Sequence, residues 1–203
     1  MKFAVLIGAA LTLSGCATLF NSAEYPPLSQ QQQSALALRQ QTLADVSAWV
    51  FNGRLSLKTA DDAWTGKVRW RQDGKQFRLH FSAPTGQGAV QLMSNPQFGV
   101  EMRTAEGAVQ YADDAETLLY DHTGWRLPVS GLRLWVVGLP NGEEKISQLS
   151  FDDQGRIETL AQYQWRIQYL QYRKVNGHDL PRKIQLQNAD LDMRIVIDHW
   201  DIL

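Results

Sequence analysis

The stretch of sequence that decides the fold runs from residue 49 to residue 81 and reads WVFNGRLSLKTADDAWTGKVRWRQDGKQFRLHF. Hydrophobic and polar side chains alternate along it, with breaks at Asp61-Asp62 and Asp73-Gly74. Side chains two residues apart in a strand lie on the same face of a sheet, and Asp-Gly is a frequent hairpin turn. The stretch therefore predicts three consecutive antiparallel strands that share one apolar face and one basic or polar face.

The same alternation continues to Tyr111 and resumes from Ile146 to Ile197. Between these parts the pattern predicts two helices. Asp113 is expected to cap the first, with Glu116 completing a capping box, and the second is expected after Pro128. Roughly ten or eleven strands with two inserted helices predict a mainly β protein whose helices partly cover the apolar face of one large curved sheet.

A sheet of this size tends to curl, and curling produces an apolar hollow. The alternation is compatible with a hollow filled by side chains and with one that is open to a ligand. A filled interior is the commoner outcome in small barrels.

The first fifteen residues are typical of a secretory signal peptide, with Lys2 before an apolar run over residues 3–13. That run is too short to cross a bilayer, which takes about 20 apolar residues. Leu13-Ser14-Gly15-Cys16 resembles the bacterial lipobox, and this resemblance implies lipid on Cys16, the single cysteine of the chain. Ala17 stands where an aspartate would resemble an inner-membrane retention signal, which favours the outer membrane.

The domain organisation predicted from these features has three parts. Residues 1–15 form the signal peptide, residues 16–28 a lipidated N-terminus with a flexible tether, and residues 29–203 a single domain. Ser29 can cap an amphipathic helix that is expected to extend to Ala48.

Composition and spacing give little support for nucleic-acid binding, metal binding or catalysis. Lysine and arginine number 20 and aspartate and glutamate 21, so the net charge of −1 provides no general attraction to nucleic acid. The four histidines lack the spacing of a metal site, and the common nucleophile and phosphate-binding motifs are missing. The pairs Asp113-Asp114 and Asp152-Asp153 are interpreted as a helix cap and a turn. We therefore expect no catalytic residue, no metal site and no cofactor.

Two stretches of the chain resemble a known family. They are YADDAE at residues 111–116 and the Leu-Pro-x-x-x-Leu-x-x-Trp-x-x-Gly-Leu-Pro pattern from Leu127 to Pro140. Both are similar to the LolB family, the outer-membrane lipoprotein receptors of the bacterial lipoprotein-localisation pathway. Supporting matches are Gly53-Arg54, Pro84-Thr85-Gly86 and Asp198-His199-Trp200.

This resemblance implies an open, incomplete antiparallel β-barrel of about 11 strands, with short helices covering its concave apolar face. It also implies a receptor rather than an enzyme, which takes lipoproteins from a soluble periplasmic carrier and inserts them into the inner leaflet of the outer membrane. The expected partners are that carrier, the lipidated cargo and the membrane, and a monomer is expected.

The site residues follow from the strand pattern and from the resemblance together. The acyl-chain cavity is expected to be lined by Phe51, Leu55, Trp70, Leu79, Phe81, Leu132 and Trp135, although ordinary core has the same composition. Pro84-Thr85-Gly86 is expected to form a membrane-insertion loop, with Thr85 where family members can present an exposed leucine. The alternative function is a structural or scaffold lipoprotein with a filled barrel and a protein partner.

Overall fold

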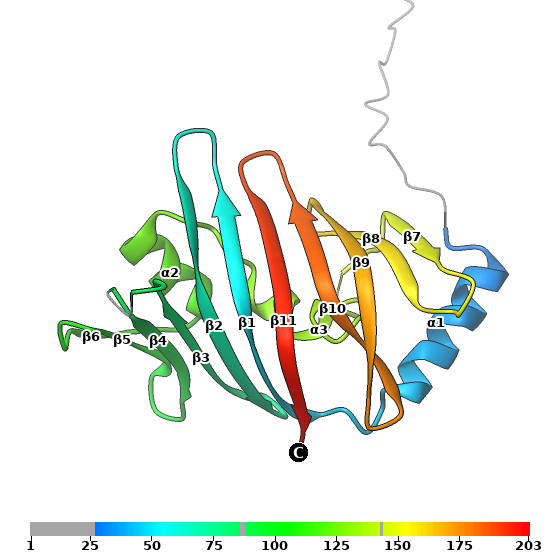
Figure 1. Cartoon of the computed structure of the whole chain (residues 1–203), viewed down its shortest axis with the longest axis horizontal. Helices are drawn as coiled ribbons and strands as arrows, with labels where there is room; N and C mark the ends of the chain where they lie inside the picture. The colour runs from blue at the N-terminus through cyan, green and yellow to red at the C-terminus, as the bar shows by residue number, and fades with distance from the viewer. Residues whose placement is uncertain (1–26, 86–87, 143) are drawn as a thin grey trace, which may run out of the picture.

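The computed structural model describes residues 27–85, 88–142 and 144–203. Over these residues eleven strands form one antiparallel sheet and three helices accompany it (Figure 1). The expected signal peptide, Cys16, most of the tether and Gly86 lie outside the described residues.

The strands before the helical region make up one half of the sheet. Their bounds are β1 (Ala48–Lys58), β2 (Ala63–Asp73), β3 (Gln76–Ser82), β4 (Val90–Asn95), β5 (Gly99–Thr104) and β6 (Val109–Ala112). The other half consists of β7 (Gln148–Phe151), β8 (Ile157–Gln162), β9 (Trp165–Val175), β10 (His178–Gln187) and β11 (Asp192–Ile202).

The strand order is β6-β5-β4-β3-β2-β1-β11-β10-β9-β8-β7. Each half is a meander of antiparallel neighbours, and the halves join where β1 pairs with β11, for example Leu55 opposite Ile195. Among the described strands β6 and β7 stand at the two ends of this order, so the sheet is open rather than a closed barrel. The predicted open antiparallel sheet of about 11 strands is confirmed.

The cross-strand register aligns apolar side chains into rows. One row crosses five strands, from β1 to β5, and its members are directly opposite one another and at most 2% exposed. It consists of Phe51, Trp70, Leu79, Leu92 and Met102. Opposed pairs are the unit of sheet stabilisation, so the row fixes the register of this half.

An aromatic cluster sits where the two halves of the sheet meet. Trp49 and Phe51 of β1 contact Trp200 of β11, each with ring centroids 5.3 Å apart, and Trp70 of β2 lies 5.7 Å from Trp49. All four rings are buried. Edge-to-face and tilted rings at these separations add to the stabilisation from burial alone, so the cluster holds β11 against β1.

Helices α2 (Ala115–Thr123) and α3 (Val129–Trp135) cover the apolar face of the sheet (Figure 1). The predicted cap of α2 was wrong by one residue, because Asp114 and not Asp113 accepts the backbone N–H of Thr117, at 2.7 Å. Glu116 does not close a capping box. Its Oε1 instead accepts the backbone N–H of Ser130 at 2.8 Å, which ties α2 to the start of α3.

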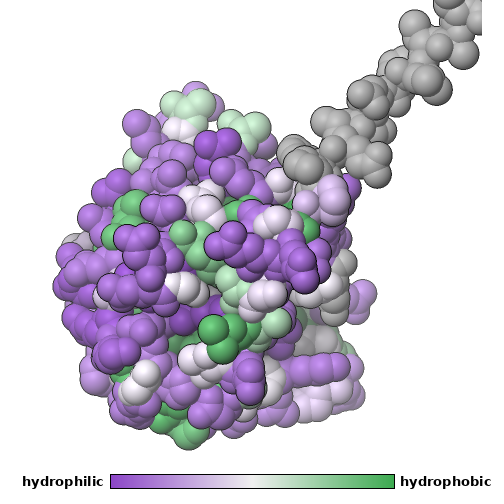
Figure 2. All heavy atoms as spheres, turned by 90° about the vertical axis from the view of Figure 1, so that its right-hand side faces the viewer, coloured by the Kyte–Doolittle hydropathy of each residue, from purple (hydrophilic) through white to green (hydrophobic). Residues whose placement is uncertain are grey.

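Helix α1 (Gln30–Thr42) begins as predicted, with Ser29 and Gln32 forming a capping box. The helix ends at Thr42 instead of Ala48, because Ala48 already belongs to β1 and pairs with Asp73. Gln32 Nε2 donates to the carbonyl oxygen of Leu149 on β7 at 2.6 Å, so α1 lies along the β7 side of the sheet. Figure 2 shows that the molecule is mainly hydrophilic on this side, with hydrophobic residues in small groups.

The alternation around β5 and β6 predicted buried apolar side chains, and three of them are exposed. Phe98, Val109 and Tyr111 are each more than two-fifths exposed, because Phe98 lies in the turn before β5 and the other two are on β6, at the end of the sheet order. Among the described helices, none has the length and apolar character needed to cross a bilayer.

Candidate functional site

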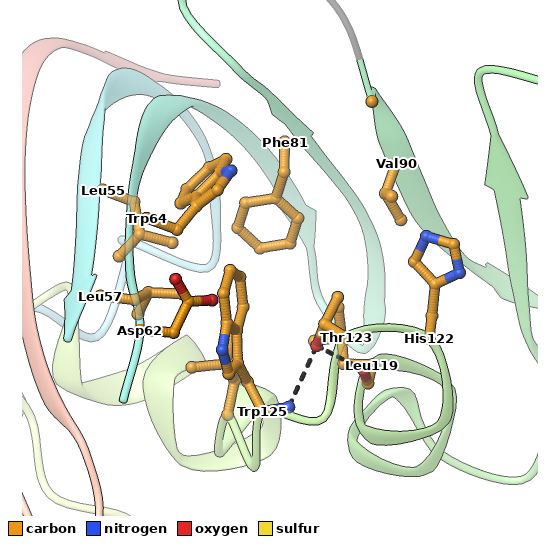
Figure 3. A pocket seen from close by; sticks show the side chains of 12 residues that line it. Leu55, Leu57, Asp62, Trp64, Phe81, Val90, Leu119, His122, Thr123 and Trp125 are labelled. Carbon is orange, nitrogen blue, oxygen red and sulfur yellow. Dashed lines mark hydrogen bonds between the residues drawn. The ribbon is translucent and has the colours of Figure 1, made fainter. Parts of the chain in front are cut away.

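A cavity of about 280 Å³ lies between the sheet and α2, near the turn that joins β1 to β2 (Figure 3). Most of its lining is apolar, and the polar members are Asp62, His122 and Thr123. The apolar side chains around it are Leu55, Leu57, Trp64, Phe81, Val90, Leu119, Trp125 and Leu127. The strands β1 to β4 supply one wall, and α2 with the segment that follows it supplies the other.

Two indole rings contact each other in the lining of this cavity. Trp64 of β2 and Trp125, which follows α2, have ring centroids 5.8 Å apart and planes at 56°. The backbone N–H of Trp125 donates to Thr123 Oγ1 at 3.2 Å, and that hydroxyl donates to the carbonyl oxygen of Leu119 at 2.6 Å. The segment after α2 is thereby held against the last turn of the helix, which fixes Trp125 on the cavity wall (Figure 3).

The position of Trp64 depends on a glycine two residues along its strand. A Cβ atom on Gly66 would overlap the Trp64 ring and the carbonyl oxygen of Ser82 on β3. Glycine is therefore needed here for a close approach, and it lets the indole fold back over its own strand.

The predicted lining residues surround a second, much smaller void. It has a volume of about 20 Å³, close to the space for a single water molecule. Of the seven predicted residues, six line this void: Phe51, Leu55, Trp70, Leu79, Phe81 and Leu132. Only Leu55 and Phe81 also line the larger cavity. The centre of the hollow is thus nearly filled by α3 and the preceding segment, and the open space lies toward one end.

Trp135 is the seventh predicted residue, and it lines neither space. It is fully buried, and its indole N–H donates to Gln162 Oε1 at 3.1 Å. Gln162 in turn donates to the carbonyl oxygens of Asn141 and Glu144, at 2.8 and 2.9 Å. Trp135 therefore joins α3 to β8 through a buried amide.

The predicted membrane-insertion loop connects β3 to β4. Pro84 and Thr85 are exposed. Gly88, farther along the same connection, lines the large cavity. The loop therefore borders the cavity.

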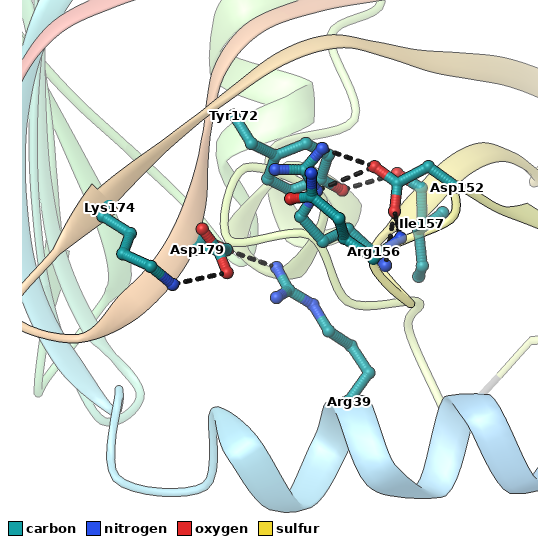
Figure 4. A network of polar contacts seen from close by, with 8 residues as sticks. Arg39, Asp152, Arg156, Ile157, Tyr172, Lys174 and Asp179 are labelled. Atoms are coloured by element: carbon teal, nitrogen blue, oxygen red, sulfur yellow. Dashed lines mark hydrogen bonds and ion pairs between the residues drawn. The ribbon is translucent and has the colours of Figure 1, made fainter.

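A cluster of charged and aromatic side chains lies away from the cavity, beside α1 (Figure 4). Arg39 is 5% exposed and Arg156 lies 4.7 Å from the centre of the Tyr172 ring. Burial lowers the pKa of Arg39 and raises the pKa of Tyr172 and of Tyr169. Tyr172 donates to the carbonyl oxygen of Ile157 at 2.6 Å. These groups have hydrogen-bond partners within the fold, which favours a role in holding α1.

The carboxylate pairs have the structural roles expected of them. Asp114 caps α2, and Asp152 accepts the backbone N–H groups of Gln154 and Arg156, both at 3.0 Å, in the turn between β7 and β8. In the described part of the chain, no three histidine, cysteine, aspartate or glutamate side chains gather closely enough to hold a metal ion.

Comparison with known proteins agrees with this architecture. The family model for the outer membrane lipoprotein LolB matches residues 47–200. The outer-membrane lipoprotein LolB of Nitrosococcus oceani is 37% identical over 99% of this chain and 98% of its own length. The same protein of Pseudomonas aeruginosa is 32% identical over 98% and 96%, respectively.

Solved structures with little sequence similarity share the fold. A LolA superfamily protein from Nitrosomonas europaea matches with a TM-score of 0.53 and 10% identity, over 85% of this chain and 93% of that chain. A DUF1329 family protein from Desulfovibrio piger matches with a TM-score of 0.53 and 7% identity, over 86% and 94%. On the family match and the identity to its relatives, the chain belongs to the LolB family of outer-membrane lipoproteins.

Proposed function

We propose that this protein receives lipoproteins from a soluble periplasmic carrier, shelters part of their acyl chains in the cavity between the sheet and α2, and releases them into the outer membrane. The observation that carries the proposal is the apolar cavity of about 280 Å³, bordered by the exposed β3–β4 connection. Cys16, acylated as the lipobox implies, would keep the domain at the membrane where release takes place.

The size of the cavity suits partial shelter of the acyl chains. Three chains of about 16 carbons, buried at about 0.8 kcal/mol per methylene, would exceed the roughly 20 kcal/mol ceiling on non-covalent affinity. A receptor that buried all three completely could not release them. A cavity of about 280 Å³ falls just below the range of roughly 300–1,000 Å³ usual for small-molecule sites, so it would take part of the lipid only.

Partial shelter also explains transfer without an energy source. The carrier would bind cargo more weakly than this protein does, and this protein more weakly than the bilayer. Each step then lowers the free energy, and no covalent chemistry is required. On this mechanism the protein is a transport factor and not an enzyme.

The nearly filled centre of the hollow is the one observation that favours the alternative, a scaffold lipoprotein that binds a protein partner. The void there holds about 20 Å³. The two functions differ in a measurable way, because a scaffold would neither bind an acyl probe nor remove cargo from the carrier.

The test is a transfer assay with a purified carrier that holds fluorescently labelled lipoprotein. We expect the protein to take up the label, and Trp64→Ala to weaken binding of the acyl chains about tenfold because the indole contact is lost. Trp64 is half-buried, so the variant should remain folded.

Phe98→Ala is the matched control, because Phe98 is also aromatic and partly exposed but lies by Tyr111, away from the cavity. It should transfer cargo as the unchanged protein does. Failure of the folded, unchanged protein to remove cargo from a competent carrier would exclude the receptor function.

A further inference from the structure

The charges of this protein are unevenly distributed despite its small net charge. Residues 48–82, which form β1 to β3, contain seven lysines and arginines against three aspartates. Residues 105–128, which include α2, contain five aspartates and glutamates against one arginine. The sheet therefore has basic strands on one side of the molecule, and its helical cover is acidic.

The basic side chains of β2 and β3 are on the outer face of the sheet. Lys67, Arg69 and Arg71 alternate along β2 with the buried residues Val68 and Trp70, so they point away from the cavity. Arg78 on β3 is exposed on the same face. We call these four residues, Lys67, Arg69, Arg71 and Arg78, the basic outer face.

Two of these cations are placed where they repel each other. Arg71 and Arg78 are directly opposite in the β2–β3 register. Like charges in this position destabilise a sheet, so the pair is not explained by stability. Next to them is a surface hollow of about 300 Å³ that both arginines line, together with Asp73, Gln76, Phe77, Met93 and Ser94.

The four cations are poorly neutralised within the protein. Arg71 Nη2 is 4.0 Å from Asp73 Oδ2, and both side chains are more than half exposed. Arg69 donates to the neutral amide of Asn52 at 2.9 Å. Among the described residues, Lys67, Arg69 and Arg78 have no carboxylate within 4.0 Å. An external anion would therefore find paired guanidinium groups available, the arrangement that suits phosphate.

We propose that the basic outer face rests on a membrane surface rich in anionic phospholipid, with Arg71 and Arg78 contacting the phosphate groups. This inference rests on the lipid anchor of the proposed function. Residues 17–29 separate Cys16 from α1, and thirteen residues span at most about 45 Å when extended. That reach keeps the domain within contact distance of the headgroups, where clustered cations strengthen attachment.

This contact would set the orientation of the cavity. The cavity and α2 are on the other face of the sheet from the basic outer face. Trp64 at the cavity and Arg71 are seven residues apart on β2, which is about 23 Å along the strand. A domain that lies on its basic outer face therefore turns the cavity toward an arriving carrier.

The experiment uses the anchored protein reconstituted into vesicles of phosphatidylcholine alone or of phosphatidylcholine mixed with phosphatidylglycerol. Phenylglyoxal modifies exposed arginines, and mass spectrometry gives the rate at each site. We expect modification of Arg71 and Arg78 to slow several-fold when phosphatidylglycerol is present, and high salt to restore the rate. Arg166, exposed on β9, is the internal control and should change little.

A paired set of variants tests which residues are responsible. The double variant Arg71→Gln, Arg78→Gln should lose the lipid-dependent protection of Arg69, whereas Arg166→Gln should retain it. Both should remain folded in a thermal melt. The double variant removes a repulsive pair, and Arg166 is exposed. Loss of the protection of Arg69 in both variants alike would contradict the assignment.

Other outcomes would overturn the proposal outright. Equal rates in the two kinds of vesicle would exclude a lipid contact. Protection that appears only with added carrier would identify a protein interface, and equal protection by inorganic phosphate would identify a site for soluble anions. No cargo is present in this assay, so its result is independent of whether the transfer assay succeeds. Retention on phosphatidylcholine vesicles reports the anchor separately.

Discussion

At the scale of single residues, the cavity depends on how closely side chains approach the backbone. The Trp64 indole folds over Gly66, where any Cβ would overlap both the ring and the Ser82 carbonyl oxygen. The ring can line the cavity only while that position has no side chain. The absence of a side chain at Gly66 thus determines the shape of this wall of the cavity.

Gly66→Ala should therefore destabilise the protein and displace Trp64. Forcing an extra methyl group into a filled site costs about 1–3 kcal/mol. Urea unfolding measures this cost, and binding of a fluorescent acyl probe reports the cavity. We expect both stability and probe affinity to fall.

The control is Gly142→Ala, since a Cβ there has no neighbour within 4 Å. It should unfold at nearly the same urea concentration as the unchanged protein. If Gly66→Ala behaved in the same way, the close contact would not be structurally significant.

The residues that line the cavity were only partly predictable from the sequence. Leu55 and Phe81 were expected to line it and do so. Phe51 and Leu79 were expected on the same grounds but surround the nearly filled void. Trp125 was missed, because nothing in the alternation of strands indicates which loop residue will fold over the apolar face.

At the scale of elements, a buried arginine helps to hold α1 against the rest of the fold (Figure 4). Arg39 Nη2 donates to the carbonyl oxygens of Asp179 and Val137, at 2.7 and 3.3 Å, and Nε donates to that of Gly138 at 3.4 Å. These carbonyl groups belong to β10 and to the segment after α3. One side chain thus joins three parts of the fold.

Arg39→Ala should loosen α1 and lower the stability by about 2–3 kcal/mol, because it leaves buried carbonyl groups without donors. Hydrogen exchange at the amides of α1 should become faster than in the sheet. Leu38→Ala, at an adjacent residue that is 65% exposed, should change neither measurement. Slow exchange of α1 in Arg39→Ala would show that other contacts hold the helix.

The turn between β7 and β8 should make stability depend on pH. Burial raises the pKa of Asp152, but hydrogen bonds from the Arg156 side chain and from backbone N–H groups outweigh it and lower the pKa below the ordinary 3.8. A carboxylate with a lowered folded-state pKa contributes stability above its unfolded pKa, and this contribution is lost as the pH falls through the folded value.

Asp152→Asn should accordingly cost about 1–2 kcal/mol at neutral pH and progressively less below about pH 4. Chemical unfolding over a pH series measures the difference between the two proteins. Asp153→Asn is the matched control, since Asp153 is exposed in the same turn, and it should show no such trend. A cost that is independent of pH would mean that the charge of Asp152 is unimportant.

At the scale of the whole molecule, we expect anchoring and cargo binding to occupy separate parts of the chain. In the described part of the chain, the core and the cavity are built from residues between Leu28 and Ile202. Lipid on Cys16 would be joined to this domain only through the tether, so removing the lipid should leave the cavity unchanged.

Cys16→Ala should therefore abolish membrane attachment while preserving uptake of cargo from the carrier in solution. Fractionation of cells measures the first property, and the transfer assay measures the second. Simultaneous loss of both in a folded variant would contradict the separation.

The sequence by itself determined which face of each strand is apolar, that neighbouring strands along the chain pair in antiparallel fashion, and roughly where the helices begin. These are local properties, because a period of two and a capping residue act over a few positions. Only the tertiary structure decided that β1 pairs with β11 and that α3 fills the centre of the hollow while leaving space at one end. The alternation along a strand specifies which face is apolar, but not how much space remains above that face. This space depends on the volumes of side chains such as Leu132 and Trp125, which reach the sheet from distant parts of the chain.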